Sequence, residues 1–218
     1  MKKLSILLFA LVLSLSAFAG KEPEKSSGIT FQALYPEPHH RRVSQVVSQL
    51  LMRQHYRQRA IDDSLSSEMF DRYLESLDPQ KLYFLQEDID AFEQYRYRFD
   101  DFVRSGQVEE AFSIFNVYQK RVAERLTYVY RRLEQPFDFS REEYLEFDRE
   151  DAPWARTRQE LDDLWRKRLK HQALNLKLAG KEWPDVVETL RKRYKRIERN
   201  ISQTQSEDVF QLLMNALS

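Results

Sequence analysis

Histidine is the side chain most often used for metal binding and for proton transfer near neutral pH, and this chain has four. They are His39, His40, His55 and His171, and none falls in an HExxH motif or in a Cys/His zinc spacing. The adjacent pair at 39 and 40 could hold a metal weakly, but the solvated beginning of a helix is the stronger interpretation. We therefore predict no metal ligand.

Nucleophilic chemistry has no recognisable motif either. The sequence lacks GxSxG and SxxK motifs, and its many serines and lysines form no pair with a catalytic arrangement that sequence alone defines. With only 4 glycines, a Gly-rich phosphate loop is not possible. We predict no catalytic residue and no cofactor.

Two groups of charged residues remain as candidates. Asp148, Glu150 and Asp151 could work as paired acid and base. Their arginine neighbours favour a surface charge network instead: Arg149, Arg156 and Arg158. The most basic run is residues 191–199 (RKRYKRIER), in which Tyr194 and Ile197 have the spacing of helical core positions. This spacing predicts that the basic residues form the solvent-exposed face of an amphipathic helix. The formal net charge is +0, which argues against a nucleic-acid binder.

Composition and periodicity predict that an all-α fold positions these residues. Scarce glycine argues against a sandwich or barrel, and 32% charged residues suit helices with one wet face. We expect an irregular array of about six to eight helices, judged from the length and from ordinary loop lengths. The aromatic residues mostly lie on the apolar stripes, so they are interpreted as core.

The first half of the chain shows four stripes at helical spacing. One is Val43, Val46, Val47, Leu50 and Leu51; a second, from Leu65 to Leu77, is stopped by Asp78-Pro79; a third runs from Ile89 to Val103 and is closed by Gly106. The fourth, from Val108 to Leu133, alternates steps of four and three residues. It predicts one long helix with a heptad seam, in which Gln119 is the single polar member.

The second half carries capping signals. Ser140 with Glu143 predicts a capping box that opens a short turn, and Thr157 with Glu160 predicts another before the stripe from Leu161 to Leu169. Gly180 is expected just after that helix, and Pro184 in the first turn of the next, which runs to Ile201. Ser206 is expected to cap a last apolar helix containing Phe210, Leu213 and Met214.

The first residues are typical of a secretory signal. Lys2 and Lys3 precede a short apolar run, and Ala17-Phe18-Ala19 offers small residues at the cleavage positions. We predict a cleavable signal peptide over residues 1–19, a linker over 20–38 and a helical domain over 39–218. Phe31, Leu34 and Tyr35 of the linker are expected to dock onto the domain. The mature chain should have no membrane span, and its location should be the periplasm.

Several segments, in this order, resemble the N-terminal helical domain of the tail-specific, or carboxy-terminal processing, proteases of the Gram-negative periplasm. They are residues 70–89 (FDRYLESLDPQKLYFLQEDI), 133–140 (LEQPFDFS), 152–154 (APW), 160–165 (ELDDLW), 174–181 (LNLKLAGK) and 205–210 (QSEDVF). Each segment alone is weak evidence, and their common order makes the resemblance strong. It covers nearly the whole chain from about Tyr35.

The resemblance implies a parent enzyme in which a PDZ domain and a protease domain follow the helical domain. The PDZ domain would receive apolar C-terminal tails by strand addition. A Ser–Lys dyad would cleave them, with a lysine of lowered pKa as the base. This sequence ends where the family would continue into the PDZ domain, so we expect a fragment that lacks both catalytic residues.

Two functions therefore remain open. The first is a non-catalytic module of a periplasmic serine endopeptidase, whose partners are the PDZ and protease domains and, through them, protein substrates. The alternative is a stand-alone periplasmic interaction module that binds an adaptor or envelope protein. The last helix discriminates between them: if Phe210, Leu213 and Met214 pack within the chain, the module can stand alone, and if they form an exposed patch, a partner is missing.

Overall fold

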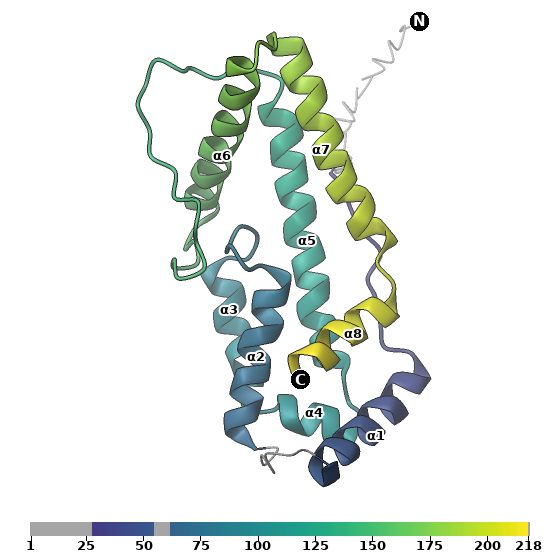
Figure 1. Cartoon of the computed structure of the whole chain (residues 1–218). Coiled ribbons are helices and arrows are strands. Elements are labelled where there is room, and N and C mark those ends of the chain that lie inside the picture. Colours follow the sequence, from purple (N-terminus) through teal and green to yellow (C-terminus); the bar gives the residue numbers. More distant parts are fainter. Residues whose placement is uncertain (1–27, 55–61, 218) are drawn as a thin grey trace, which may run out of the picture.

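The computed structural model describes residues 28–54 and 62–217, without the side chains of residues 51–54, and its folded part is built from helices (Figure 1). These are α1 (Pro38–Gln54), α2 (Asp63–Leu77), α3 (Gln86–Phe92), a 3₁₀ turn η1 (Glu93–Tyr95), α4 (Phe99–Ser105), α5 (Glu109–Arg132), α6 (Arg158–Leu178), α7 (Trp183–Gln203) and α8 (Ser206–Leu217). No named strand occurs among the described residues, which confirms the all-α prediction.

Helix α5 is the central element, and the heptad seam predicted for it is confirmed. Figure 1 shows α6 and α7 beside one half of α5, with α8 near its other end. Every seam position is buried, with exposed fractions of 0–4%: Val108, Phe112, Phe115, Gln119, Val122, Leu126, Val129 and Leu133. A helix of 24 residues is about 36 Å long. Helix α5 can therefore serve two separate cores along its length.

The core is divided into two clusters that share α5. The first joins α2, α4 and α8 to the N-terminal half of α5, through residues that include Phe70, Tyr73, Phe99, Phe112 and Leu213. The second joins α6 and α7 to the C-terminal half of α5, through residues that include Leu126, Val129, Trp165, Leu169 and Leu190. Most of the aromatic residues lie in these clusters, as predicted.

The turn after α2 is organised by one buried carboxylate. Asp78, 1% exposed, accepts hydrogen bonds from the backbone N–H groups of Leu82 (2.7 Å), Tyr83 (2.8 Å) and Phe84 (3.0 Å). Burial raises the pKa of Asp78, and the three N–H donors oppose that rise. The predicted stop at Asp78-Pro79 is therefore confirmed, and the aspartate also shapes the loop that follows.

Three further end signals are confirmed. The Thr157 hydroxyl accepts the N–H of Glu160 at 3.1 Å, at the beginning of α6. Gly180 ends α6 with a φ of 86°, and the N–H of Lys181 bonds the carbonyl of Leu176, as in a Schellman motif. Gly106 follows α4 with a φ of 73°, and a Cβ there would lie 2.6 Å from the carbonyl oxygen of Arg41. Only glycine fits that approach of α1.

The prediction of one helix from Ile89 to Val103 was wrong, because the chain breaks there into α3, η1 and α4. The break is fixed by Ser66 of α2. Its hydroxyl donates to the carbonyl of Arg96 at 2.8 Å and accepts the N–H of Phe99 at 2.8 Å. A side chain from another helix thus satisfies the groups that a continuous helix would have paired internally.

The predicted buried face of α1 was also wrong. Val43, Val46 and Leu50 are 40%, 49% and 48% exposed, Val47 is half-buried against the first core, and the side chain of Leu51 lies outside the described residues. The buried face instead consists of small or polar side chains: His40, Ser44 and Ser48. The hydroxyl of Ser44 donates to the carbonyl of Val103 at 2.7 Å, so α1 packs on α4 through close polar contact.

The connection between α5 and α6, residues 133–157, contains no helix, so the predicted capping box at Ser140 was wrong. Ser140 binds the carboxylate of Asp138 instead, through its hydroxyl at 2.6 Å and its N–H at 2.9 Å. Glu143 forms ion pairs with Arg166 and Lys170 of α6, which lower its pKa to about 2. The carboxylate expected in the capping box of a short turn therefore anchors the connection to α6.

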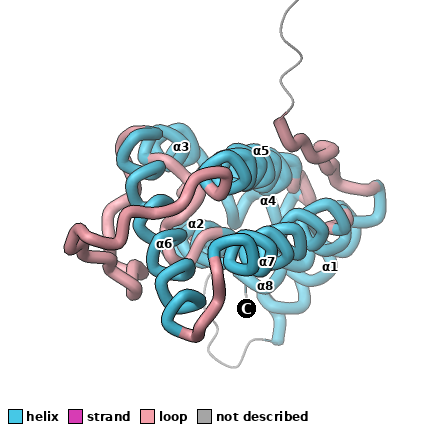
Figure 2. The backbone as a smooth tube through the Cα atoms, turned by 90° about the horizontal axis from the view of Figure 1, so that it is seen from above, coloured by secondary structure: helices cyan, strands magenta, loops and turns pink. Residues whose placement is uncertain are grey.

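The N-terminal segment, residues 28–37, is extended and lies across the bundle from the connection, as the end-on view in Figure 2 shows. Leu34 packs on the first core and Phe31 on the second, as predicted, whereas Tyr35 is 70% exposed and does not dock. The predicted signal peptide, residues 1–19, lies outside the described residues. Within the described part, no helix has the length and apolar character to cross a membrane.

Candidate functional site

The histidines come together with a carboxylate in one place, between α1 and α8. The Nε2 atoms of His39 and His40 lie 3.0 and 3.1 Å from Oε2 of Glu207, and these three side chains form a group of possible metal ligands. His40 is 0% exposed and stacks on Phe210, so its predicted solvation was wrong. His171 lies apart, against Phe147, and His55 is outside the described residues.

The hydrogen bonds of His40 argue against a metal at this point. Its Nδ1 accepts the backbone N–H of Glu37 at 2.9 Å, so a neutral His40 carries its proton on Nε2 and donates it to Glu207. A metal bound at Nε2 would need the lone pair that this proton occupies. The geometry therefore favours a hydrogen-bonded tie between α1 and α8, and these bonds lower the pKa of Glu207.

The acidic cluster forms neither an acid–base pair nor the network predicted for it. Asp148, Glu150 and Asp151 are exposed in the irregular connection. The neighbouring arginines bind other carboxylates: Arg149 pairs with Glu146 at 3.2 Å, and Arg158 pairs with Glu124 at 3.4 Å. The expected network was thus wrong in its partners, because folding brings α5 and the connection to these arginines.

The basic run in α7 is the wet face of an amphipathic helix, as predicted. Lys192, Arg193, Lys195, Arg196 and Arg199 are exposed, whereas Tyr194 is buried and Ile197 half-buried. Ion pairs at 2.6 Å join Lys192 to Glu188 and Lys195 to Glu198. The exclusion of a nucleic-acid partner stays a prediction.

The last helix packs within the chain. Phe210 is 3% exposed and Leu213 0% exposed, and both belong to the first core, against which Met214 is partly buried. The predicted cap was one residue late, because Ser206 is already the first residue of α8. The carboxylate of Asp208 accepts the N–H of Gln205 at 2.8 Å and satisfies the helix beginning instead.

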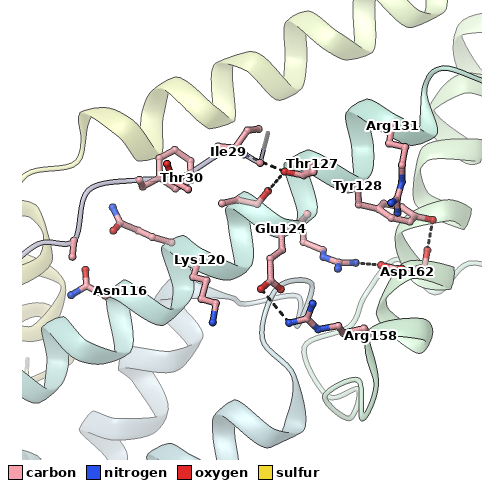
Figure 3. A pocket seen from close by; sticks show the side chains of 16 residues that line it. Ile29, Thr30, Asn116, Lys120, Glu124, Thr127, Tyr128, Arg131, Arg158 and Asp162 are labelled. Atoms are coloured by element: carbon pink, nitrogen blue, oxygen red, sulfur yellow. Dashed lines mark hydrogen bonds and ion pairs between the residues drawn. The ribbon is translucent and has the colours of Figure 1, made fainter. Parts of the chain in front are cut away.

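A groove with a volume of about 540 Å³ runs along the outer face of α5 (Figure 3). Its floor is α5, and residues 28–33 and the first turns of α6 line its two sides. Two α5 side chains fix the extended segment. The amide of Asn116 donates to the carbonyl of Leu34 and accepts its N–H, both at 2.9 Å, and Thr127 accepts the N–H of Ile29 at 3.4 Å.

Charged side chains surround the opposite side of the groove. Arg125 pairs with Asp162 of α6, and Glu124 pairs with Arg158 (Figure 3). The hydroxyl of Tyr128 donates to the carbonyl of Asp162 at 2.8 Å, and burial together with the nearby Asp162 raises the pKa of this phenol. Proton transfer near neutral pH is therefore not a task for this phenol.

Gln119, the polar member of the heptad seam, lines this groove at 4% exposure. Sequence analysis identified Gln119 as unusual but did not predict the groove. The missing information was the position of residues 28–34, because periodicity describes helices and gives no register for an extended segment laid along one.

Comparison with known proteins identifies the family of this domain. A family model described as the tail-specific protease N-terminal domain matches residues 46–218, which include both cores. The chain belongs to this family. The tail-specific protease of Haemophilus influenzae is 34% identical to the chain over 206 residues, which are 94% of this chain and 29% of that protein. The resemblance inferred from the ordered segments is thereby confirmed, and the chain spans less than a third of the length of this relative.

Three of the segments that carried the resemblance, residues 70–89, 152–154 and 160–165, meet at one joint of the fold. Nζ of Lys81 donates to the carbonyl of Ala152 at 2.8 Å and lies 5.6 Å from the centre of the Trp154 ring. Nε1 of Trp165 donates to the carbonyl of Leu82 at 2.6 Å. In this tail-specific protease domain, these residues therefore join α6 and the α5–α6 connection to the turn after α2. Their role is structural.

Proposed function

We propose that this domain is the non-catalytic N-terminal module of a periplasmic tail-specific serine endopeptidase, which degrades or processes proteins from their apolar C-termini. The observation that carries the proposal is the family match over residues 46–218. It is supported by the use of charged side chains in structural ion pairs, such as those of Arg121 with Glu87 and of Arg125 with Asp162. In the enzyme, the module braces the PDZ and protease domains. It also helps to form the cavity through which unfolded tails reach a Ser–Lys dyad on the protease domain.

Peptidase measurements test this proposal directly. The purified chain, mixed with a fluorescent unstructured protein that ends in an apolar tail, should give no cleavage above buffer. The Haemophilus influenzae relative without its matching region should regain cleavage when the chain is added. A variant with a disrupted core, Leu169→Asp, is the matched control and should restore nothing. Cleavage by the chain alone that scales with its concentration would contradict the non-catalytic role.

The periplasmic location has its own test, because the signal peptide and its cleavage are part of the proposal. Mass spectrometry of a periplasmic extract should find an N-terminal peptide that begins at Gly20. An N-terminus at Met1, or recovery only from the cytoplasmic fraction, would contradict it. The same experiment shows whether PDZ and protease peptides accompany this domain in one polypeptide.

A second function, a stand-alone periplasmic interaction module, is favoured by the packing of α8. Phe210 and Leu213 complete the first core, so the described helices do not need a partner to cover the last one. Such a module would bind an adaptor or envelope protein. If the chain fails to restore cleavage yet is recovered from the periplasm at its own mass, bound to another protein, the second function replaces the first.

A further inference from the structure

An unpartnered polar side chain in the groove points to a ligand. Gln119 is 4% exposed, and its amide forms no hydrogen bond with any residue that the structure describes. The amide atoms are not fully enclosed, so a molecule that enters the groove can reach them. Since the amide lines the groove, a ligand there can supply the missing donor and acceptor.

Asn116 shows which kind of ligand an amide in this groove binds. It lies one turn before Gln119 on α5, and its side chain holds the N–H and the carbonyl of Leu34 together. This is recognition of an extended main chain, independent of its side chains. Residues three apart on a helix lie on the same face, so Gln119 offers the same chemistry about one turn further along the groove.

The extended segment offers a second set of free groups. The main-chain N–H and carbonyl groups of residues 30–33 form no hydrogen bond with other described residues, although Ile29 and Leu34 on either side are bonded to α5. Thr30, Gln32 and Ala33 are exposed. An unpaired extended edge is a ready template for a second strand.

The charges of the groove select among extended polypeptides. Arg125 and Arg158 have carboxylate partners, whereas Lys120 and Arg131 form no ion pair with a described residue. Among the described residues, the groove therefore has two cations without an ion-pair partner, and it suits a segment that carries carboxylates. Its volume of about 540 Å³ lies within the usual range for ligand sites.

We propose that this groove binds an extended, acidic segment of another polypeptide, recognised through its main chain by residues 30–33 and Gln119 and through its carboxylates by Lys120 and Arg131. This binding site does not depend on the proposed role in a protease, since an extended acidic segment can come from any partner protein. Failure of the peptide to bind the groove would overturn this proposal alone. Failure of the chain to restore cleavage would overturn the proposed function alone.

Fluorescence anisotropy with the whole chain tests the site. The probe is a fluorescein-labelled peptide of about ten alternating Thr and Val residues that includes two glutamates, compared with a version that has lysines in their place. We expect saturable binding of the acidic peptide and at least about fivefold weaker binding of the basic one. A third version, N-methylated at alternate residues, loses main-chain donors and should bind at least about tenfold more weakly.

Variants of the chain locate the binding. Gln119→Leu keeps the size of the side chain and should weaken the acidic peptide about fivefold, the worth of one hydrogen bond. Lys120→Glu should weaken it to a similar degree, and the matched charge reversal Lys192→Glu, at an exposed site on α7, should leave the affinity unchanged. Absence of saturable binding at millimolar peptide, or binding that neither Gln119→Leu nor N-methylation weakens, would overturn the proposal.

Discussion

Replacing Gln119 with leucine should make the domain more stable. The position lies on the heptad seam of α5, where the other members are apolar, and the amide is 4% exposed without a described partner. Leucine has nearly the same size, removes the unsatisfied amide and adds apolar burial. Because the amide atoms keep contact with the open groove, their desolvation is incomplete, and we expect a gain of about 1 kcal/mol in the free energy of unfolding, mainly from the added apolar burial.

Urea unfolding followed by circular dichroism measures this gain as a higher transition midpoint at unchanged slope. In a thermal scan, a domain of about this size should melt about 2–4 °C higher for each kcal/mol. The matched control is Leu126→Gln, one heptad later in the same seam and 2% exposed. That change introduces a buried amide where none exists and should cost about 3 kcal/mol or more.

The result that would refute this reasoning is a loss of more than about 1 kcal/mol on Gln119→Leu, because it would mean that the amide has a structural partner in the folded chain. If the groove is a binding site, Gln119→Leu should both stabilise the domain and weaken its affinity for the acidic peptide. A residue retained for binding is expected to carry such a trade-off.

Three other changes test how the domain is held together. Arg121 donates to the carboxylate of Asp88 at 2.8 and 2.9 Å. Arg121→Met leaves this buried carboxylate without its partner and should cost about 3–5 kcal/mol in urea unfolding. A cost below about 1 kcal/mol would contradict this. Glu143 has a folded pKa of about 2, below its unfolded value of about 4.3. Its contribution to stability is therefore present above pH 4.3 and is lost as the pH falls toward 2, so the stability difference between the wild type and Glu143→Gln should shrink over that window and stay constant from pH 5 to 7. Phe210→Ala should cost about 3–5 kcal/mol, since this ring is 3% exposed in the first core; a cost typical of a surface site would mean that α8 is not docked in solution.

Sequence patterns predicted the long, regular elements well. The seam of α5 was recognisable because its period persists over 24 residues, and Asp78-Pro79, Thr157 and Gly180 marked helix ends through local chemistry. These features depend on residues close together in the sequence. Their outcomes could therefore be derived before the fold was known.

The failures share a cause, which is a partner from elsewhere in the chain. Ser66 of α2 interrupts the helix predicted from Ile89, and α6 takes Glu143 away from its expected cap. On α1, hydrophobicity indicated the wrong face because Ser44 packs against α4 through a hydrogen bond. None of these partners is visible in periodicity. The groove was missed for the same reason, since the register of residues 28–34 on α5 is a tertiary fact.

The two amides on α5 together explain why a polar residue remains in an otherwise apolar seam. Asn116 and Gln119 are one turn apart and line one groove, yet among the described residues Asn116 bonds to a main chain and Gln119 does not. If Gln119 served only to fill the core, leucine would do so with less cost, because it carries no polar group to desolvate. The amide is understandable if a second extended chain lies beside it for part of the time. The chain's own N-terminal segment then occupies one position of a groove with room for a further strand.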